Sequence, residues 1–271
     1  MLPVIDSQPG SMPLIINVPH DGREIPADIG AKMTAEALAL PDTDWHIRDL
    51  YDFAHEMGAT VTSARYSRYV VDLNRDPVGK SLYPGADTTE VCPTRTFQQN
   101  SIYRKGEAPT DVEIGNRLDE FWHPYHAALE QTILDVHKQF GAVLLFDAHS
   151  IGSVLPRFFE GRLPDFNLGT ADGTSAASNL ADVLFKILDE VPQTTAVLNG
   201  RFKGGYITRN YGNPSYNIHA VQLEIGQSSY MEDGPPYRIL PDRVAEIKPV
   251  LTELLKTGLD WIQSTSTGEG T

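Results

Sequence analysis

The sequence has few of the features that mark extracellular or membrane proteins. Its 271 residues include one cysteine, Cys92, which excludes an intrachain disulfide and any metal site built from several cysteines. The longest purely apolar runs, such as AVLLF at 142–146, are far too short to cross a bilayer. The N-terminal segment lacks the basic and apolar regions of a signal peptide. We therefore expect a soluble, cytoplasmic protein with no membrane partner.

Basic residues are also scarce. Lysine and arginine number 22 against 36 acidic residues, which gives a formal net charge of -14. This balance disfavours a nucleic-acid partner, because such binding needs a basic face. It still allows a small anionic substrate if a few arginines gather in one pocket. No internal repeat, low-complexity tract or long linker divides the chain, so we expect one domain over residues 1–271 and leave the oligomeric state open.

Short apolar runs alternate with segments of helical periodicity. The predicted strands are 13–18, 60–64, 68–74, 142–150, 194–200 and 220–226, and the predicted helices are 44–57, 111–140 with a kink at Pro124, 175–190 and 241–263. A long Gly-, Pro- and Thr-rich loop covers 78–108; such loops often line functional sites. Strands that are apolar throughout, separated by helices, predict an α/β fold with a mixed or mostly parallel sheet covered by helices.

Polar side chains occur at the ends of several of these strands, where α/β proteins collect their ligands. They are His20, the pair Asn74 and Arg75, Asp147 with His149, and Glu224. Charged groups beside apolar strands are costly unless they are paired or bound to a metal. The pattern therefore predicts a functional site at one edge of the sheet.

Two histidines and one carboxylate make a ligand set for a hydrolytic zinc site that keeps a position open for water. His20 and His149 supply the histidines in this hypothesis. His20 alone is better explained as a turn residue bonded to the backbone, and the second strand-end histidine makes the metal hypothesis comparable. The carboxylate has four nearby candidates, which are Asp21, Glu24, Asp42 and Asp44. Asp44 begins a predicted helix, where it either aims its carboxylate at the metal or caps the helix.

Other histidines offer a competing pair. His123 and His126 lie three residues apart and share a helix face, but Pro124 and the aromatic neighbours favour packing over metal binding. Asp147 has two interpretations, since it can orient His149 by a hydrogen bond or cap the next turn.

Glu224 in the strand VQLEIG is unusual, because an apolar strand seldom tolerates a glutamate. It is a candidate general base with a raised pKa; the alternative is a glutamate that faces solvent. Arg68, Arg75 and Arg209 are candidate anion ligands, because arginine binds carboxylates through two hydrogen bonds, or else surface ion-pair partners.

Six motifs together resemble the N-formylglutamate amidohydrolase family. They are VPHDG, PDTDWHIRDLYDFA, RYVVDLNRDP, FDAHSIG, GRFKGGYITRNYGNP and HAVQLEIGQSSYM, in that order between about residues 13 and 232. The family is similar to the zinc-carboxypeptidase and aspartoacylase group. The resemblance implies a three-layer α/β/α fold with a mixed, mostly parallel sheet of about eight strands.

The resemblance also implies roles for individual residues. It implies one divalent metal, zinc first with cobalt, manganese or iron as alternatives, held by His20, an acid and His149. Asp44 takes the acidic position, with Glu24 as the fallback. Glu224 matches the catalytic glutamate of the group, and Arg68, with Arg65 as its competitor, matches the arginine that polarises the oxyanion. Asn74 and Arg75 match the clamp on the substrate carboxylate, and Arg209 a further substrate contact.

The implied reaction is hydrolysis of the dianion N-formyl-L-glutamate to formate and L-glutamate, a step of histidine degradation. Three alternatives share some of these residues. A deacylase for another N-acyl amino acid differs only in its acyl pocket, and a carboxypeptidase-like enzyme uses the same chemistry. A non-catalytic metal- or amino-acid-binding protein has no need of the general base.

Overall fold

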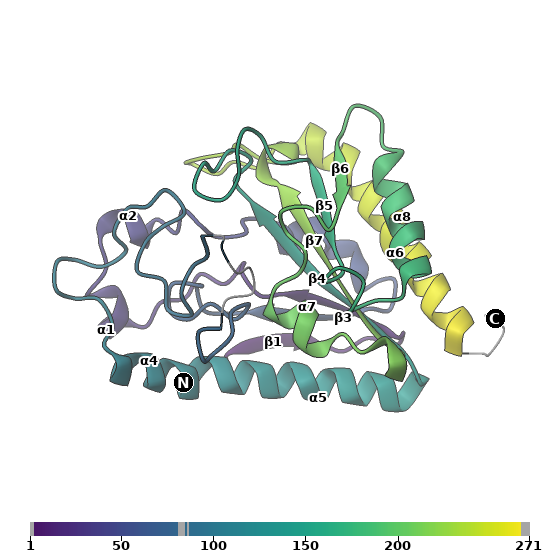
Figure 1. The fold of residues 1–271 in the computed structure, drawn as a ribbon, viewed down its shortest axis with the longest axis horizontal. Coiled ribbons are helices and arrows are strands. Elements are labelled where there is room, and N and C mark those ends of the chain that lie inside the picture. Colours follow the sequence, from purple (N-terminus) through teal and green to yellow (C-terminus); the bar gives the residue numbers. More distant parts are fainter. Residues whose placement is uncertain (1–2, 81–84, 86, 267–271) are drawn as a thin grey trace.

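The centre of the fold is a seven-stranded sheet (Figure 1), seen in a computed structural model that describes residues 3–80, 85 and 87–266. Its strands lie in the order β1-β3-β2-β4-β7-β5-β6, so the N-terminal part of the chain forms one edge and the C-terminal part the other. The strands are β1 (Ile5–Gln8), β2 (Leu14–Val18), β3 (Thr60–Ala64), β4 (Val143–Ile151), β5 (Phe166–Gly169), β6 (Ala196–Leu198) and β7 (Ile218–Gly226).

The sheet is mixed and mostly parallel. Parallel pairing joins β2 to β3 and to β4, β4 to β7, and β5 to β6. The exceptions are β1, which is antiparallel to β3, and β5, which is antiparallel to β7. The α/β fold with a mixed sheet is thus confirmed, with seven strands in the described residues where about eight were expected.

Helices cover both faces of the sheet, with α4 and α5 on one side and α6 and α8 on the other (Figure 1). The helices are α1 (Ala27–Gly30), α2 (Ala35–Leu38), α3 (Ile47–Leu50), α4 (Asp111–Arg117), α5 (His123–Phe140), α6 (Ser178–Asp189), α7 (Tyr206–Tyr211) and α8 (Pro241–Ser266). Leu14 and Ile16 belong to the core under α6 and α8, whereas Ile15 belongs to the core under α5. Because β2 is buried on both faces, its sequence is apolar throughout.

Shorter helical turns complete the structure. They are the 3₁₀ turns η1 (Asp52–Ala54), η3 (Pro214–Tyr216) and η4 (Gln227–Ser229), and the π-helical turn η2 (Leu118–Trp122). Within the described residues, no helix combines the length and the apolar character needed to cross a membrane.

Two predicted elements differ in the structure. The segment 44–57 is no single helix but α3 followed by η1, because His46 before α3 has a left-handed φ of 65°. The segment 68–74 is no strand but a series of turns. The Arg117 guanidinium donates hydrogen bonds to the carbonyl oxygens of Tyr69 and Val70 at 3.5 and 3.2 Å. This side chain therefore satisfies buried carbonyls that a neighbouring strand would otherwise bind.

The predicted helical segment 111–140 is present as α4, η2 and α5. Thr110 and Glu113 form a reciprocal capping box at its start, which satisfies two of its otherwise unpaired N–H groups. The π-helical turn ends immediately before α5, whose first turn contains Pro124. Since proline has no N–H for the carbonyl four residues earlier, the hydrogen-bond ladder shifts at this point.

Candidate active site

The carboxyl ends of β2, β4 and β7 bring the predicted polar clusters together. These three strands are parallel neighbours, with Asn17 opposite Asp147 and His149 opposite Glu224. His20 is the second residue after β2, whereas His149 lies inside β4, which continues to Ile151. The expected convergence of strand-end side chains is therefore realised.

A tight turn fixes His20. The N–H groups of Arg23 and Glu24 both donate to the carbonyl of Arg65, at 3.0 and 3.1 Å. At Gly22 a Cβ atom would lie 2.3 Å from the carbonyl oxygen of Tyr66. Only glycine allows this approach, so the HDG turn is held against the end of β3 and directs His20 toward the centre of the sheet edge.

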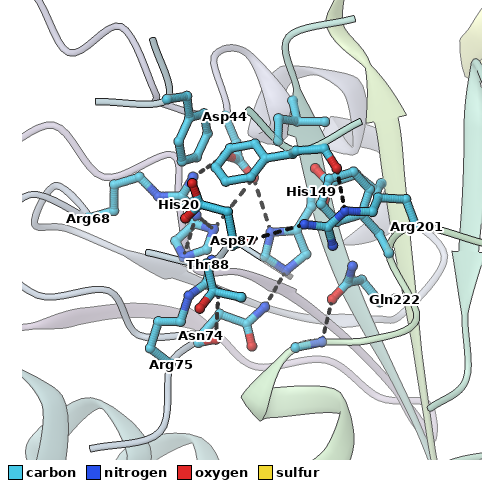
Figure 2. A pocket seen from close by; sticks show the side chains of 16 residues that line it. His20, Asp44, Arg68, Asn74, Arg75, Asp87, Thr88, His149, Arg201 and Gln222 are labelled. Carbon is cyan, nitrogen blue, oxygen red and sulfur yellow. Dashed lines mark hydrogen bonds and ion pairs between the residues drawn. The ribbon is translucent and has the colours of Figure 1, made fainter. Parts of the chain in front are cut away.

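His20, Asp44 and His149 form a buried cluster (Figure 2). Their ligand atoms all lie within 4.8 Å of one another. Asp44 Oδ2 is 3.1 Å from His149 Nδ1 and 3.8 Å from His20 Nδ1. Asp44 does not cap α3, where His46 holds the N-cap position; its Oδ2 instead accepts the N–H of Ser150 at 3.1 Å. This cluster can hold a metal ion.

The opposite nitrogen of each histidine contacts a second carboxylate. His20 Nε2 lies 2.8 Å from Asp72 Oδ1, and His149 Nε2 lies 3.0 Å from Asp147 Oδ2. Both carboxylates can accept a hydrogen bond from Nε2–H. That tautomer leaves on Nδ1 of each ring the lone pair that a metal ligand needs. Asp72 was missed by the sequence reasoning, although an acid inside the apolar run YVVDL gave the same signal as Glu224.

The charge of the cluster also suits a cation. Four buried carboxylates meet here, from Asp44, Asp72, Asp147 and Glu224. Among the described residues that are fully buried in the cluster, Arg68 is the permanent cation opposing them. Because buried charges need compensation, a divalent metal between the two Nδ1 atoms and Asp44 fits the donor set and the charge.

The competing acids lie elsewhere. Glu24 is exposed and sits beside Tyr66 in an isolated bridge. Asp21 is paired with Arg48 at 2.6 Å, and Asp42 accepts the Tyr69 hydroxyl at 2.7 Å. The geometry thus favours Asp44 as the acidic ligand.

Arg68 reaches the cluster and Arg65 does not. Arg68 Nη2 donates to His20 Nδ1, and Arg68 Nη1 lies 3.9 Å from Asp44 Oδ1. Its guanidinium lies over the ring of Phe97, 5.0 Å from the centroid. Arg65 instead pairs with Asp6 at the outer edge of the sheet. Of the two arginines, Arg68 is the one positioned to stabilise negative charge on a bound molecule.

Burial and neighbouring charges shift the pKa values of this cluster in opposite directions. Burial, aided by Arg68, lowers the pKa of His20 to about 4. Burial also opposes protonation of His149, but the carboxylates of Asp147 and Asp44 outweigh it and raise its pKa well above the ordinary value. Burial raises the pKa of Glu224 to about 8, against the attraction of His149. Glu224 can therefore take up and release a proton near neutral pH.

Asn74 and Arg75 lie on the other wall. Asn74 Oδ1 accepts the N–H of Ile207 at 2.8 Å, and its Nδ2 lies 3.1 Å from His149 Nε2. Gly205 permits this contact, since a Cβ there would lie 2.3 Å from Asn74 Nδ2. Arg75 Nε donates to the carbonyl and hydroxyl oxygens of Thr89 at 3.3 and 3.1 Å. Asn74 thus ties α7 to the histidines, and Arg75 lines the pocket.

The start of α5 holds the backbone of this pair. His126 Nε2 donates to the carbonyl of Leu73 at 2.9 Å, and Trp122 Nε1 donates to the carbonyl of Arg75 at 3.2 Å. His126 Nδ1 lies 2.8 Å from the Tyr211 hydroxyl, while the His123 side chain is 54% exposed. The packing interpretation is confirmed for His126, whose two ring nitrogens are both engaged, whereas His123 is largely exposed.

The metal-site cluster, Arg68, Asn74, Arg75 and Glu224 border one cavity of about 60 Å³ that opens to solvent. Its described lining consists of His20, Asp44, Arg68, Asn74, Arg75, Asp87, Thr88, Phe97, His149, Ile151, Phe158, Arg201, Phe202, Gly205, Gln222 and Glu224. Arg209 is not in this group; it lies on α7, where its Nε donates to the carbonyl of Gly204. Arg201 and Gln222 were missed, although Gln222 was visible as a second polar residue in the β7 run.

Comparison with known proteins gives a consistent result. The model of the N-formylglutamate amidohydrolase family matches residues 12–231. The chain is 45% identical over 258 residues to N-formylglutamate deformylase of Pseudomonas putida, covering 95% of this chain and 96% of that protein. The deformylase of Pseudomonas aeruginosa is also 45% identical over 258 residues, with 95% and 97% covered.

Solved structures resemble the whole chain. The crystal structure of N-formylglutamate amidohydrolase from Ralstonia eutropha JMP134 has a TM-score of 0.80 and 26% identity, covering 97% of this chain and all of that one. A gene product of Agrobacterium tumefaciens has a TM-score of 0.73 at 19% identity, covering 96% of each chain, and shares the fold.

Proposed function

The chain belongs to the N-formylglutamate amidohydrolase family, and we propose that it hydrolyses the amide of N-formyl-L-glutamate to formate and L-glutamate. One observation carries the proposal beyond the similarity. A buried His20–Asp44–His149 cluster and the buried Glu224 line the same cavity. A ligand set for a metal and a proton-transfer group are thus placed where one substrate can contact both.

We assign one divalent metal to His20, Asp44 and His149, zinc before cobalt, manganese or iron. Two imidazole nitrogens and one carboxylate oxygen are the donors that catalytic zinc sites use. When bound there, the metal would polarise the amide carbonyl and lower the pKa of water, to about 7 in the most favourable cases.

Glu224 is the proposed proton carrier. It accepts a proton from the water molecule whose oxygen attacks the formyl carbon. It then returns that proton to the amide nitrogen as the C–N bond breaks, so formate and the free amine of glutamate leave. Its pKa of about 8, raised by burial, suits a group that must hold the proton between these two steps.

Arginines are the proposed partners of the negative charges on the substrate and on the oxyanion that forms during the reaction. Arg68 stabilises the oxyanion that forms on the attacked carbonyl, an effect worth roughly 3–4 kcal/mol for one well-placed donor. Arg75, next to Asn74, binds a substrate carboxylate with its guanidinium, which is held in place by Thr89. Arg209 stays a prediction as a further substrate contact, since it does not belong to the described lining of the cavity.

The wider setting is part of the same proposal. Residues 1–271 would act as one amidohydrolase domain, because the single sheet takes strands from both halves of the chain. The partner is a small dianionic N-acyl amino acid, and the reaction would be a cytoplasmic step of histidine degradation.

A substrate panel tests the proposal. Purified, metal-supplemented protein is assayed against the N-formyl, N-acetyl and N-succinyl derivatives of glutamate and aspartate, with the released acid and amine measured separately. We expect the highest kcat/KM for N-formylglutamate. A preference for N-acetyl or N-succinyl substrates would make the protein a different deacylase, and tight binding without turnover would make it a binding protein.

The variant Glu224→Gln tests the mechanism. It should keep the metal and the fold but lose about 10²–10⁴-fold in kcat, the usual contribution of a positioned acid–base group. Glu190→Gln is the matched control, because its side chain is 66% exposed at the end of α6. Near-normal formate release by Glu224→Gln would remove Glu224 from the mechanism.

A further inference from the structure

Two arginines face the cavity from opposite sides of the histidine cluster. Arg75 lies in the long connection between β3 and α4, and Arg201 lies in the segment between β6 and α7. In Figure 2 their guanidinium groups flank His20 and His149, with Arg75 on the side of Asn74 and Arg201 on the side of Gln222. Besides Arg68, which is assigned to the oxyanion, the cavity thus has two separated cations, and these match a ligand with two separated carboxylates.

Arg201 is held by backbone oxygens and aromatic rings. Its Nε donates to the carbonyl of Phe158 at 2.7 Å, and its Nη2 donates to the carbonyl of Asp87 at 3.2 Å. Its guanidinium carbon lies 5.8 Å from the ring centroid of Phe158 and 5.2 Å from that of Phe202. These contacts restrain the guanidinium before a ligand arrives, which lowers the entropy lost on binding.

The neighbouring Arg157 shows a different arrangement. Its guanidinium makes a two-pronged ion pair with Asp87, with Nε–Oδ2 and Nη2–Oδ1 distances of 3.0 and 3.1 Å. Asp87 thus presents its carboxylate to Arg157 and its backbone carbonyl to Arg201. Arg157 is not part of the described cavity lining, whereas Arg201 is.

We propose that Arg201 binds the side-chain carboxylate of the substrate and makes the enzyme selective for N-formyl derivatives of dicarboxylic amino acids. The inference rests on the proposed function for the reaction that it serves. It assigns the second carboxylate to Arg201, a residue of the cavity wall, rather than to Arg209 on α7.

The assignment of each carboxylate follows from its distance to the scissile bond. The α-carboxylate is on the carbon that carries the amide nitrogen, so it stays close to the reacting group. Asn74, which precedes Arg75, contacts the His149 ring at 3.1 Å; this pair therefore takes the α-carboxylate. The side-chain carboxylate is then left to Arg201, whose guanidinium is held against Phe158 and Phe202 in the wall of the same cavity.

The test compares N-formyl-L-glutamate with N-formyl-L-glutamine, which has nearly the same shape but a neutral side chain. In Arg201→Met the ratio of kcat/KM for the two substrates should fall by roughly 10- to 100-fold, the size of a charge-assisted hydrogen bond. The activity toward N-formylglutamine should change little. Arg201→Lys, which keeps the charge but loses the planar fork, should restore part of the ratio.

Three further variants make the result specific. Arg75→Met should lower kcat/KM for both substrates, because both carry the α-carboxylate. Arg238→Met is the matched control, since Arg238 is 69% exposed and pairs with Glu232 at 3.7 Å. Arg209→Met is the competitor: if it, and not Arg201→Met, removes the preference for the charged side chain, the proposal is overturned. Equal losses on both substrates in Arg201→Met would indicate a purely structural role and would also overturn it.

A binding measurement separates this inference from the proposed function. Calorimetry with the product L-glutamate and with L-glutamine reports the carboxylate contact without turnover. If wild-type protein releases no formate from any substrate, the proposed function fails, yet a glutamate preference lost in Arg201→Met would still support the binding role. If wild-type protein shows no glutamate preference in either assay, the inference fails alone.

Discussion

Two pairs of histidines in this chain differ in whether the fold brings their rings together in one cluster. His123 and His126 are three residues apart at the start of α5, yet they build no common site: the side chain of His123 is 54% exposed, and His126 is buried beneath the Leu73 loop. His20 and His149 come from different parts of the chain, and their rings lie 4.9 Å apart between centroids. Proximity in sequence is therefore a poorer guide to a site than position at the carboxyl ends of neighbouring parallel strands.

The difference lies in the partners of the two ring nitrogens. His126 has a carbonyl oxygen at one nitrogen and a tyrosine hydroxyl at the other, so its hydrogen-bonding capacity is used by the protein. His20 and His149 each have a carboxylate at Nε2 and direct Nδ1 toward Asp44. The first arrangement stabilises a loop, and the second is suited to holding a metal ion.

The largest expected effect comes from removing a ligand of the second pair. His149→Ala should lose its metal and at least about a thousandfold in kcat/KM, since a catalytic metal contributes several kcal/mol to transition-state binding. His126→Ala should keep its metal. Elemental analysis of both purified variants makes the comparison, and full metal occupancy in His149→Ala would mean that the ligand set is wrong.

The first pair should instead respond in stability. His126→Ala leaves the buried carbonyl of Leu73 without its donor and opens a cavity, so we expect a loss of about 2–4 kcal/mol in the free energy of unfolding. His126→Gln retains a donor and should lose less. His123→Ala, at an exposed position, should stay within about 0.5 kcal/mol. Urea denaturation measures all three, and a comparable loss in His123→Ala would contradict the contrast.

The partners of the rings give a smaller contrast. Asp147→Asn weakens the acceptor at His149 Nε2 and should lower metal affinity about 10- to 100-fold. Tyr211→Phe removes the corresponding partner of His126 and should leave metal affinity unchanged. Competition with a chromophoric chelator measures both affinities. Equal affinity in wild type and Asp147→Asn would show that this carboxylate does not prepare His149 for the metal.

The smallest effect is a pH dependence of stability. Burial lowers the pKa of His126 from its ordinary value of 6.5 to about 4. Between pH 4 and pH 6.5, His126 is protonated in the unfolded chain but neutral in the folded protein, so acid favours unfolding. The contribution of His126 to the free energy of unfolding is complete only above pH 6.5. This contribution should fall by about 1 kcal/mol between pH 7 and pH 5.5.

The variant His126→Gln isolates this contribution, because glutamine does not titrate. The difference in unfolding free energy between wild type and His126→Gln should therefore narrow as the pH is lowered from 7 to 5.5, as measured by urea denaturation at each pH. A difference that is independent of pH would mean that His126 is not held neutral by burial.

Much of the site was predictable because its residues violate local rules. Glu224 stands in an apolar strand, and His20 follows a strand of five buried residues. Burying such polar groups costs free energy unless they are hydrogen-bonded or paired with a charge, so their presence indicates a functional site. Asp72 gave the same signal in the run YVVDL but was read as part of a strand. The sequence around Arg201 gave no such signal, because an arginine in a glycine-rich loop is usually exposed. Only the folded loop shows that this side chain reaches the cavity.

The errors in the fold have a common cause. The segment 68–74 is apolar enough for a strand, but its carbonyls are bound by the side chains of Arg117 and His126 from the distant helical segment 111–140. The segment 44–57 has helical periodicity, but its first residue is drawn into the site by Ser150 and His149. In both cases a partner far away in the sequence overrides the local preference.

The sequence by itself determined the α/β fold, the parallel strands that end in polar residues, and the histidines and glutamate of the site, because apolar periodicity and buried charge are local properties of the chain. Only the tertiary structure brings Asp44 rather than Glu24, and Arg68 rather than Arg65, to the histidine cluster, and only it shows which arginines border the cavity. Those choices depend on distances between segments that no local pattern encodes. The physical reason is that the strand order β2-β4-β7 and the crossing loops set these distances, and burial then makes each pairing obligatory.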